Sequence, residues 1–177
     1  MDFDQVIGKV PNHPKPGILF FDVMPMFRDP AALDAAISRI VEWARPRKVD
    51  VVIGAESRGF ILGGAVAQHL GAGFVTARKP GKLPGATVSR EYALEYGTDR
   101  LEVQADAIRP GQRVLIHDDL LATGGTGAAK IELVESLGGI VVGTAFVVEL
   151  TFLGGRERLT PHEVFSLVKY HSDAVPA

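Results

Sequence analysis

The sequence predicts an α/β fold with a mostly parallel, twisted sheet and helices on both of its faces. Short apolar runs alternate with segments of helical periodicity, which is the pattern of strand-helix-strand units. Two of these units contain a turn rich in small residues between strand and helix, at residues 54–59 and 118–127. Because the carboxyl ends of parallel strands share one edge of a sheet, we expect ligands to bind at that edge.

The expected elements follow one another without a linker or a repeat. Residues 11–17 contain three prolines, which exclude a regular helix there. Asp29 then caps a helix that has Pro30 at its first position and an apolar face ending at Ala44. The order after this helix is a strand at 49–53, a helix at 59–70, a strand at 74–77, a polar hairpin-like segment at 78–100, a strand at 114–117 and a helix at about 128–137.

The composition is that of an ordinary globular protein. The 177 residues are 46% apolar and 23% charged, which predicts one domain over residues 1–177. With 19 basic and 21 acidic side chains, the net charge of −2 predicts neither a nucleic-acid nor a membrane partner. The longest uncharged apolar run, Gly138 to Val148, is too short to cross a bilayer, and the acidic start lacks a basic leader, so we expect a cytoplasmic protein. Without cysteine, thiol catalysis and thiolate metal sites are excluded.

Residues 114–126, VLIHDDLLATGGT, combine a strand, two acids and a glycine-rich turn. The glycines let successive N–H groups and a helix N-terminus point at one anion. Asp118 and Asp119 can accept hydrogen bonds from vicinal hydroxyls, which suits a ribose better than a second phosphate. We therefore predict that this loop binds ribose 5-phosphate through Asp118, Asp119, Ala122, Thr123, Gly124, Gly125 and Thr126. The alternative is an ordinary glycine turn with solvated acids; a Walker lysine and a dinucleotide fingerprint are absent.

A second strand-to-helix turn, at residues 54–60, carries Glu56, Ser57 and Arg58. Such a turn suits a diphosphate, because a guanidinium offers two parallel donors and the helix N-terminus supplies more. A capped helix with a solvated arginine is the alternative.

Between strands, residues 78–85 contain the cations Arg78, Lys79 and Lys82 together with two prolines and two glycines. A solvated surface loop is one interpretation. Next to two phosphate-binding turns, we interpret the segment as a flexible lid that closes over the diphosphate and excludes water.

These motifs together resemble a known family. Residues 114–126 are similar to the phosphoribosyl diphosphate (PRPP) motif of type I phosphoribosyltransferases, and residues 89–97, SREYALEYG, match the family's S-x-x-Y-x-L-E-Y-G segment, by which its purine-specific subgroup is best recognised. The resemblance is nearly end to end. It implies the type I phosphoribosyltransferase fold with a small N-terminal hood, and a purine salvage enzyme that transfers ribose 5-phosphate from PRPP to N9 of adenine, giving AMP and diphosphate. It also implies a homodimer.

The resemblance assigns chemistry to individual residues. Glu95 would help move a proton of the purine, and Arg58 would act with Lys79 and Lys82 on the leaving diphosphate. Mg²⁺ would be the cofactor, held by PRPP with Asp118 and Asp119 nearby rather than by direct protein ligands. A non-proline cis peptide is expected at Glu56-Ser57.

The adenine pocket is also implied by resemblance. Phe20 would stack on the purine, Leu150 would cover its other face, and Leu19 and Phe21 would lie at the base edge. Without the family, Phe20 and Leu150 read as core residues.

This chain departs from the family pattern at three positions. Phe21 replaces a common arginine, Met24 replaces a threonine or serine, and His117 replaces an aliphatic residue. His117 is interpreted as a core histidine, with a pH-sensitive partner of Asp118 as the alternative. Two other functions stay open: a PRPP-binding regulator without catalysis, and an enzyme for hypoxanthine, guanine or xanthine.

Overall fold

Five parallel strands form the centre of the fold, in the order β4-β3-β7-β8-β9. The computed structural model describes residues 1–93 and 97–173. The strands of this sheet are β3 (Val51–Ala55), β4 (Gly73–Ala77), β7 (Arg113–Leu121), β8 (Ile140–Leu150) and β9 (Val164–Tyr170). The predicted parallel sheet is therefore confirmed.

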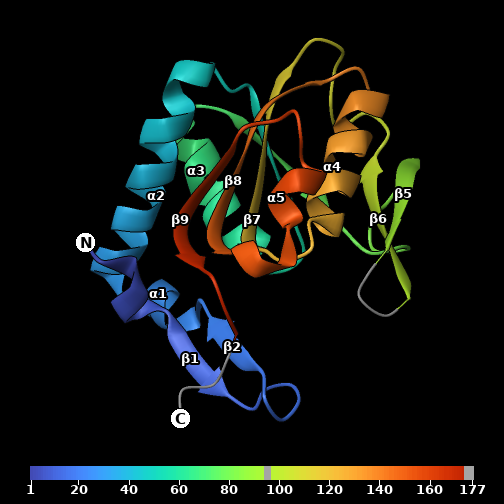
Figure 1. The fold of residues 1–177 in the computed structure, drawn as a ribbon. Helices are drawn as coiled ribbons and strands as arrows, with labels where there is room; N and C mark the ends of the chain where they lie inside the picture. The colour runs from blue at the N-terminus through green and yellow to red at the C-terminus, as the bar shows by residue number, and fades with distance from the viewer. Residues whose placement is uncertain (94–96, 174–177) are drawn as a thin grey trace.

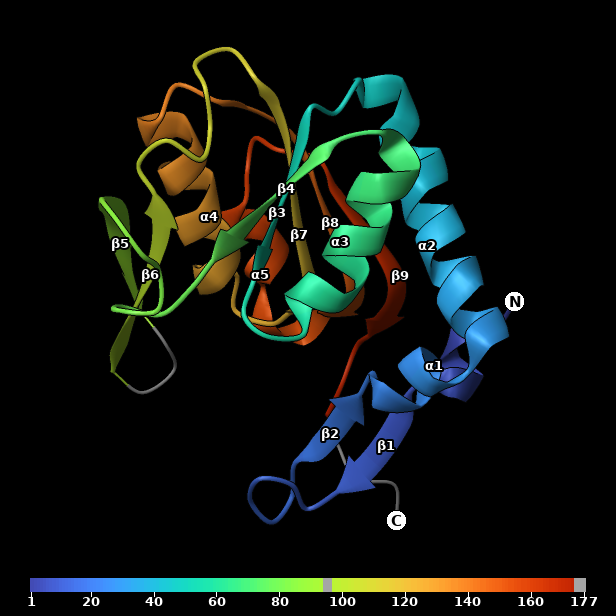
Figure 2. The same ribbon diagram turned by 180° about the vertical axis from the view of Figure 1, so that it is seen from behind.

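Helices cover both faces of the sheet, as the alternating pattern predicted (Figures 1 and 2). One face carries α2 (Pro30–Ala44) and α3 (Gly59–Leu70), and the other carries α4 (Gly125–Ser136) with the short α5 (Gly155–Arg158). Asp29 caps α2 as expected, because its carboxylate accepts the N–H groups of Ala31 and Ala32.

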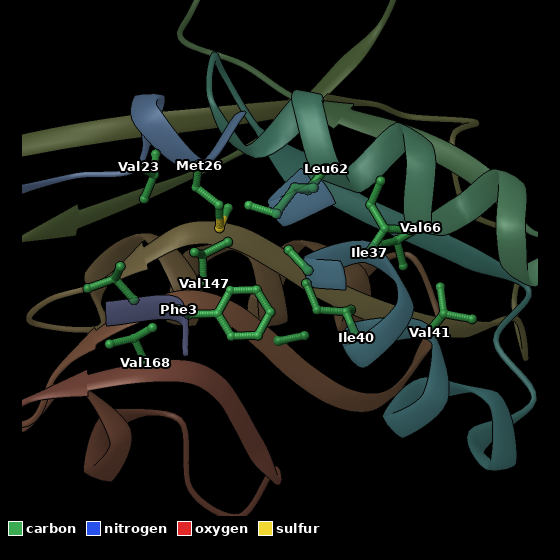
Figure 3. Packing of buried hydrophobic residues seen from close by; sticks show 14 of the residues in the cluster. Phe3, Val23, Met26, Ile37, Ile40, Val41, Leu62, Val66, Val147 and Val168 are labelled. Carbon is green, nitrogen blue, oxygen red and sulfur yellow. The ribbon is translucent and has the colours of Figure 1, made fainter. Parts of the chain in front are cut away.

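Alternation along β7 divides the core into two. Leu115 packs in the cluster beneath α2 and α3, whereas Val114 and Ile116 pack in the cluster beneath α4. Figure 3 shows the first cluster, in which Ile40 of α2 and Leu62 of α3 are packed together with buried residues of the sheet. Burial on both faces accounts for the continuous apolar runs of the central strands.

A small antiparallel hairpin precedes the sheet. It consists of β1 (Gly8–Pro11) and β2 (Leu19–Asp22), and it is flanked by the 3₁₀ turn η1 (Phe3–Val6) and by α1 (Met24–Arg28). Figure 1 shows this hairpin beyond the end of the sheet towards which β9 points, which is its carboxyl edge. The hairpin occupies the place of the N-terminal hood that the resemblance implied.

The polar segment after β4 forms a second antiparallel hairpin. Its strands are β5 (Thr87–Ala93) and β6 (Thr98–Gln104), and it lies beside α4 (Figures 1 and 2). The remaining 3₁₀ turns are η2 (Arg45–Arg47) and η3 (Thr151–Leu153). No helix in residues 1–93 and 97–173 is both long and apolar enough to cross a membrane.

The bounds of β3, α4 and β7 differ from the sequence prediction. Strand β3 runs from Val51 to Ala55 rather than over residues 49–53, and just before it the Asp50 side chain accepts the N–H of Arg113. Helix α4 starts at Gly125, three residues before the first apolar position. The largest difference is β7, which continues to Leu121 and so includes both acids that had been assigned to the loop.

Candidate active site

The turn that is predicted to bind ribose 5-phosphate, residues 122–126, joins β7 to α4; it is called the ribose-phosphate turn below. Gly124 precedes the helix with a φ of 81°, a left-handed conformation that favours glycine. The first N–H groups of α4 have no acceptor within the helix, so they are available to an anion. Behind the turn lies Gly155 of α5, since a Cβ added at Gly124 would stand 2.5 Å from the Gly155 carbonyl oxygen. The turn is therefore held between two helices.

Asp118 and Asp119 are strand residues rather than loop residues. Both are almost fully buried, at 8% and 7% exposure, and each has its own cation. The Nζ of Lys130 lies 2.8 Å from Asp118 Oδ2, and the Nε of Arg58 lies 2.8 Å from Asp119 Oδ2. The strand continues through the acids because β7 pairs with β8 as far as Leu121, and the two ion pairs compensate carboxylates whose burial would otherwise be costly.

The environment of Asp119 disfavours its charge. Burial and the neighbouring Asp118 carboxylate raise the pKa of Asp119 to about 6, and the guanidinium of Arg58 opposes this increase. Asp119 is therefore ionised at neutral pH but close to titration.

The predicted diphosphate turn lies beside these acids. Arg58 is at the N-cap of α3, and the Glu56-Ser57 peptide is cis, as the resemblance implied. Gly59, which follows Arg58, has no room for a side chain, because a Cβ there would stand 2.6 Å from Asp118 Oδ1. The absence of a side chain at Gly59 thus brings the start of α3 against the ribose-phosphate strand.

Glu56 connects the diphosphate turn to the predicted lid. Its Oε1 accepts the backbone N–H of Lys79 at 2.6 Å, and its Oε2 accepts from Arg78 Nε at 2.9 Å. Burial opposes the charge of Glu56, but these donors outweigh it and lower its pKa. In this structure Glu56 and Arg78 therefore bind each other, while Lys82 is exposed, its carbonyl accepts from Arg78 and its backbone N–H donates to the Lys79 carbonyl.

A chain of three polar side chains links the predicted lid to the ribose-phosphate turn. Lys79 Nζ lies 3.3 Å from Asp99, which also accepts the Tyr92 hydroxyl at 3.3 Å. Tyr92 is within hydrogen-bonding reach of Thr126 as well. Tyr92 thus joins the β5–β6 hairpin to the start of α4.

These elements enclose a cavity of about 270 Å³. Of the predicted residues, it is lined by Glu56, Arg58, Lys79, Asp118, Asp119, Ala122, Thr123, Gly124, Gly125 and Thr126. Ser57, Arg78 and Lys82 lie in the same two loops but do not line it. A larger hollow of about 690 Å³ lies between the N-terminal segment, α2 and β9, and it contains none of the predicted residues.

The residues assigned to the base do not line the cavity. Leu19 and Phe20 are half-buried in the hood hairpin, where the Phe20 ring meets His13 edge-on at 5.0 Å. The Phe21 ring is buried and stacked on Tyr170 at 3.7 Å, so only its main chain is left for a base. Leu150 is half-buried at the carboxyl end of β8. Their binding of adenine stays a prediction, and Glu95 lies outside the described residues.

His117 is a core residue, as interpreted from the sequence. It is fully buried, its Nδ1 is 3.0 Å from the Ala145 carbonyl, and its Nε2 has no hydrogen-bond partner among the described residues. Burial lowers the pKa of His117 to about 4, with Asp118 and Lys130 acting in opposite directions. The imidazole is therefore neutral at physiological pH, which argues against a sensor role near pH 7.

The neutral state of His117 should make the fold sensitive to acid. Below 6.5 the unfolded chain protonates this side chain while the folded chain does not until about 4, so stability falls across that window. His117 alone should lower the free energy of unfolding by about 2 kcal/mol between about pH 7.5 and about pH 5. In urea titrations, His117→Val should lose less stability over that interval than the wild type; an equal loss would contradict this prediction.

Gly155, Tyr92 and Lys130 are among the site residues that were not identified from the sequence. Gly155 had no local signal, because its contact is with the main chain of the ribose-phosphate turn. Tyr92 lies inside the matched SREYALEYG segment, so the motif could have identified it. Lys130 was also detectable, since it lies three and four residues before Leu133 and Val134 on the buried side of α4.

Comparison with known proteins decides the family. The family model described as the phosphoribosyl transferase domain matches residues 28–172. Adenine phosphoribosyltransferase of Desulfitobacterium hafniense (strain Y51) is 55% identical over 170 residues, which are 96% of this chain and 98% of that protein. The chain belongs to the adenine phosphoribosyltransferase family.

Solved structures of adenine phosphoribosyltransferases share the fold. That of Thermoanaerobacter pseudethanolicus superposes with a TM-score of 0.91 at 49% identity, over 95% of this chain and 98% of that one. The Saccharomyces cerevisiae protein, solved with an imino-altritol bisphosphate and adenine, gives 0.87 at 44% identity, over 93% and 96% of the two chains. The adenine phosphoribosyltransferase fold thus extends over nearly all of this chain.

Proposed function

We propose that this protein transfers ribose 5-phosphate from PRPP to N9 of adenine, giving AMP and diphosphate for purine salvage. The observation that carries the proposal is the meeting of two anion-binding turns in one cavity, with a pair of carboxylates between them. Membership in the adenine phosphoribosyltransferase family supports the same reaction.

Electrostatics would supply most of the catalysis. Departure of diphosphate leaves positive charge at the ribose C1 and adds negative charge to the leaving group. Arg58 and Lys79 line the cavity on the diphosphate side, where they would neutralise the leaving group. Asp118 and Asp119 line it beside the ribose-phosphate turn, where they would accept hydrogen bonds from the ribose hydroxyls.

The carboxylates also fit a magnesium-bound substrate. Mg²⁺ keeps several waters and takes few protein ligands when it binds with phosphates. In residues 1–93 and 97–173, no three His, Cys, Asp or Glu side chains form a metal cluster. We propose that Mg²⁺ is held by the oxygens of PRPP, with Asp118 and Asp119 nearby, and that it adds positive charge to the diphosphate.

The hood is proposed to hold the base. Phe20 would stack on adenine with Leu150 on the other side, and the main chain of Leu19 and Phe21 would contact the base edge. The imino-altritol bisphosphate and adenine bound by the Saccharomyces cerevisiae relative support a phosphorylated sugar and adenine as neighbouring ligands here. The family resemblance also supports a homodimer, which sedimentation equilibrium would measure.

Glu95 is proposed to move the proton of the purine. General acid-base catalysis contributes roughly 100- to 10,000-fold, so Glu95→Ala should lower kcat by about that factor. Binding of PRPP should stay near normal, because the phosphates are bound by other loops. Single-turnover kinetics and PRPP calorimetry would measure the two effects. Unchanged turnover would remove Glu95 from this role. Glu91→Ala, which changes an exposed glutamate of β5, is the matched control.

A panel of bases tests the function directly. The protein is incubated with PRPP and Mg²⁺ against adenine, hypoxanthine, guanine, xanthine and uracil, and the nucleotide and the diphosphate are measured. AMP formed from adenine alone is expected. Turnover of another base would overturn the base assignment but keep the site chemistry, and PRPP binding without any turnover would identify a regulator instead.

A further inference from the structure

The lysine behind the ribose site has no assigned role in the reaction. Lys130 lies in α4, the helix that begins with the ribose-phosphate turn, and it is the largest fully buried side chain in the described part of the protein. Its Nζ donates to the His117 carbonyl at 2.6 Å and to Asp118 Oδ2 at 2.8 Å. A lysine is almost never fully buried without such partners.

These contacts confine the Asp118 carboxylate from three directions. Oδ2 is bound by Lys130, while Oδ1 accepts the backbone N–H of Asp119 at 3.1 Å. The main chain of Gly59 closes the third direction, because even a Cβ there would lie 2.6 Å from Oδ1. The carboxylate is thus held in one orientation at the wall of the cavity.

The charge of Lys130 matters for a polyanionic ligand. Two adjacent carboxylates in the cavity wall would repel the phosphates of PRPP. Arg58 compensates Asp119 from the diphosphate side, and Lys130 compensates Asp118 from inside the core. Stability alone does not require this ion pair, because apolar residues commonly replace both partners of a buried pair without loss, whereas removal of the lysine alone leaves the Asp118 carboxylate without its cation.

We propose that Lys130 is a positioning residue for PRPP, which fixes the Asp118 carboxylate towards the ribose and cancels its charge without touching the ligand. The proposal rests on the proposed binding of PRPP at this cavity. Lys130 therefore acts through Asp118, and its effect should disappear when Asp118 no longer carries a charge.

Calorimetry with PRPP and Mg²⁺ in the absence of adenine tests the role independently of turnover. Lys130→Met should raise the Kd for PRPP roughly 10- to 100-fold, as expected for a lost charge-assisted contact. Lys48→Met is the control, because Lys48 is an exposed lysine ahead of β3, at the opposite edge of the sheet. A purely structural role would reduce the folded fraction and leave the Kd of the folded protein unchanged, which would overturn the proposal.

A double variant covers the case in which Lys130→Met does not fold. Asp118→Asn is compared with the double variant Asp118→Asn/Lys130→Met. The double variant removes both charges of the ion pair, so it leaves no buried charge without a partner. Equal Kd values for PRPP in these two proteins support action through Asp118. A further loss in the double variant would overturn it. Wild-type binding is measured first: its absence would overturn the proposed function together with this role, whereas a defect confined to the Lys130 variants concerns Lys130 alone.

Discussion

Gly155→Ala is expected to lower kcat/KM for PRPP by roughly 100-fold, the loss that a displacement of about 1 Å in a binding group can cause. A Cβ at Gly155 would overlap the Ala122 carbonyl oxygen and stand 2.9 Å from the Gly124 nitrogen. Both atoms belong to the main chain of the ribose-phosphate turn, which must move away. The N–H groups that we propose for the 5-phosphate would then lose their alignment.

Steady-state kinetics with PRPP as the varied substrate measures this effect. Gly64→Ala is a matched control, because a Cβ at Gly64 meets nothing within 4 Å and alanine is favoured in a helix. It should keep the wild-type KM for PRPP. Wild-type kinetics in Gly155→Ala would mean that α5 can shift without disturbing the turn, and that its packing does not position the phosphate site.

Arg58→Gln is expected to lower kcat/KM for PRPP by roughly 100- to 1,000-fold, the usual loss for one electrostatic donor in an active site. The guanidinium lines the cavity and is 37% exposed, so it can reach a ligand while it holds Asp119. Its removal deletes a diphosphate donor and also leaves the Asp119 carboxylate without its cation. Arg39→Gln, which changes an exposed arginine on α2, should be neutral.

Arg58→Gln should also change the pH dependence of the reaction. Asp119 must be ionised to accept from the ribose hydroxyls, so kcat/KM should fall as the pH decreases through about 6. Arg58 opposes the raised pKa of Asp119, and without it this acidic limb should move to higher pH. A pH–rate profile measures the shift. An acidic limb that stays in place would show that another group is responsible for it.

Local patterns in the sequence were sufficient to locate the two strand-to-helix turns, whose binding of phosphates stays a prediction. A contiguous motif contains its strand, its glycines and its hydroxyls, so the ribose-phosphate loop and the Glu56-Ser57-Arg58 turn could be found without coordinates. Helices α2, α3 and α4 were predicted from their periodicity and from the Asp29 cap.

The prediction was incomplete where periodicity is ambiguous. No element was assigned beyond residue 137, although β8 and β9 complete the sheet there. A continuous apolar run such as the one in β8 can be a buried strand or part of a buried helix, and only its pairing with β7 distinguishes them. The short helix α1 was missed for a similar reason, because five residues are too few to show a helical period.

By itself the sequence determined the fold class, the order of the main elements up to residue 137 and the positions of the two strand-to-helix turns, because these depend on residues that are neighbours in the chain. Only the tertiary structure decided which charges pair. Arg58 meets Asp119, and Lys130 meets Asp118, across separate elements whose approach is set by sheet register and helix packing. Such contacts depend on distances in space, which the spacing of residues along the chain does not specify.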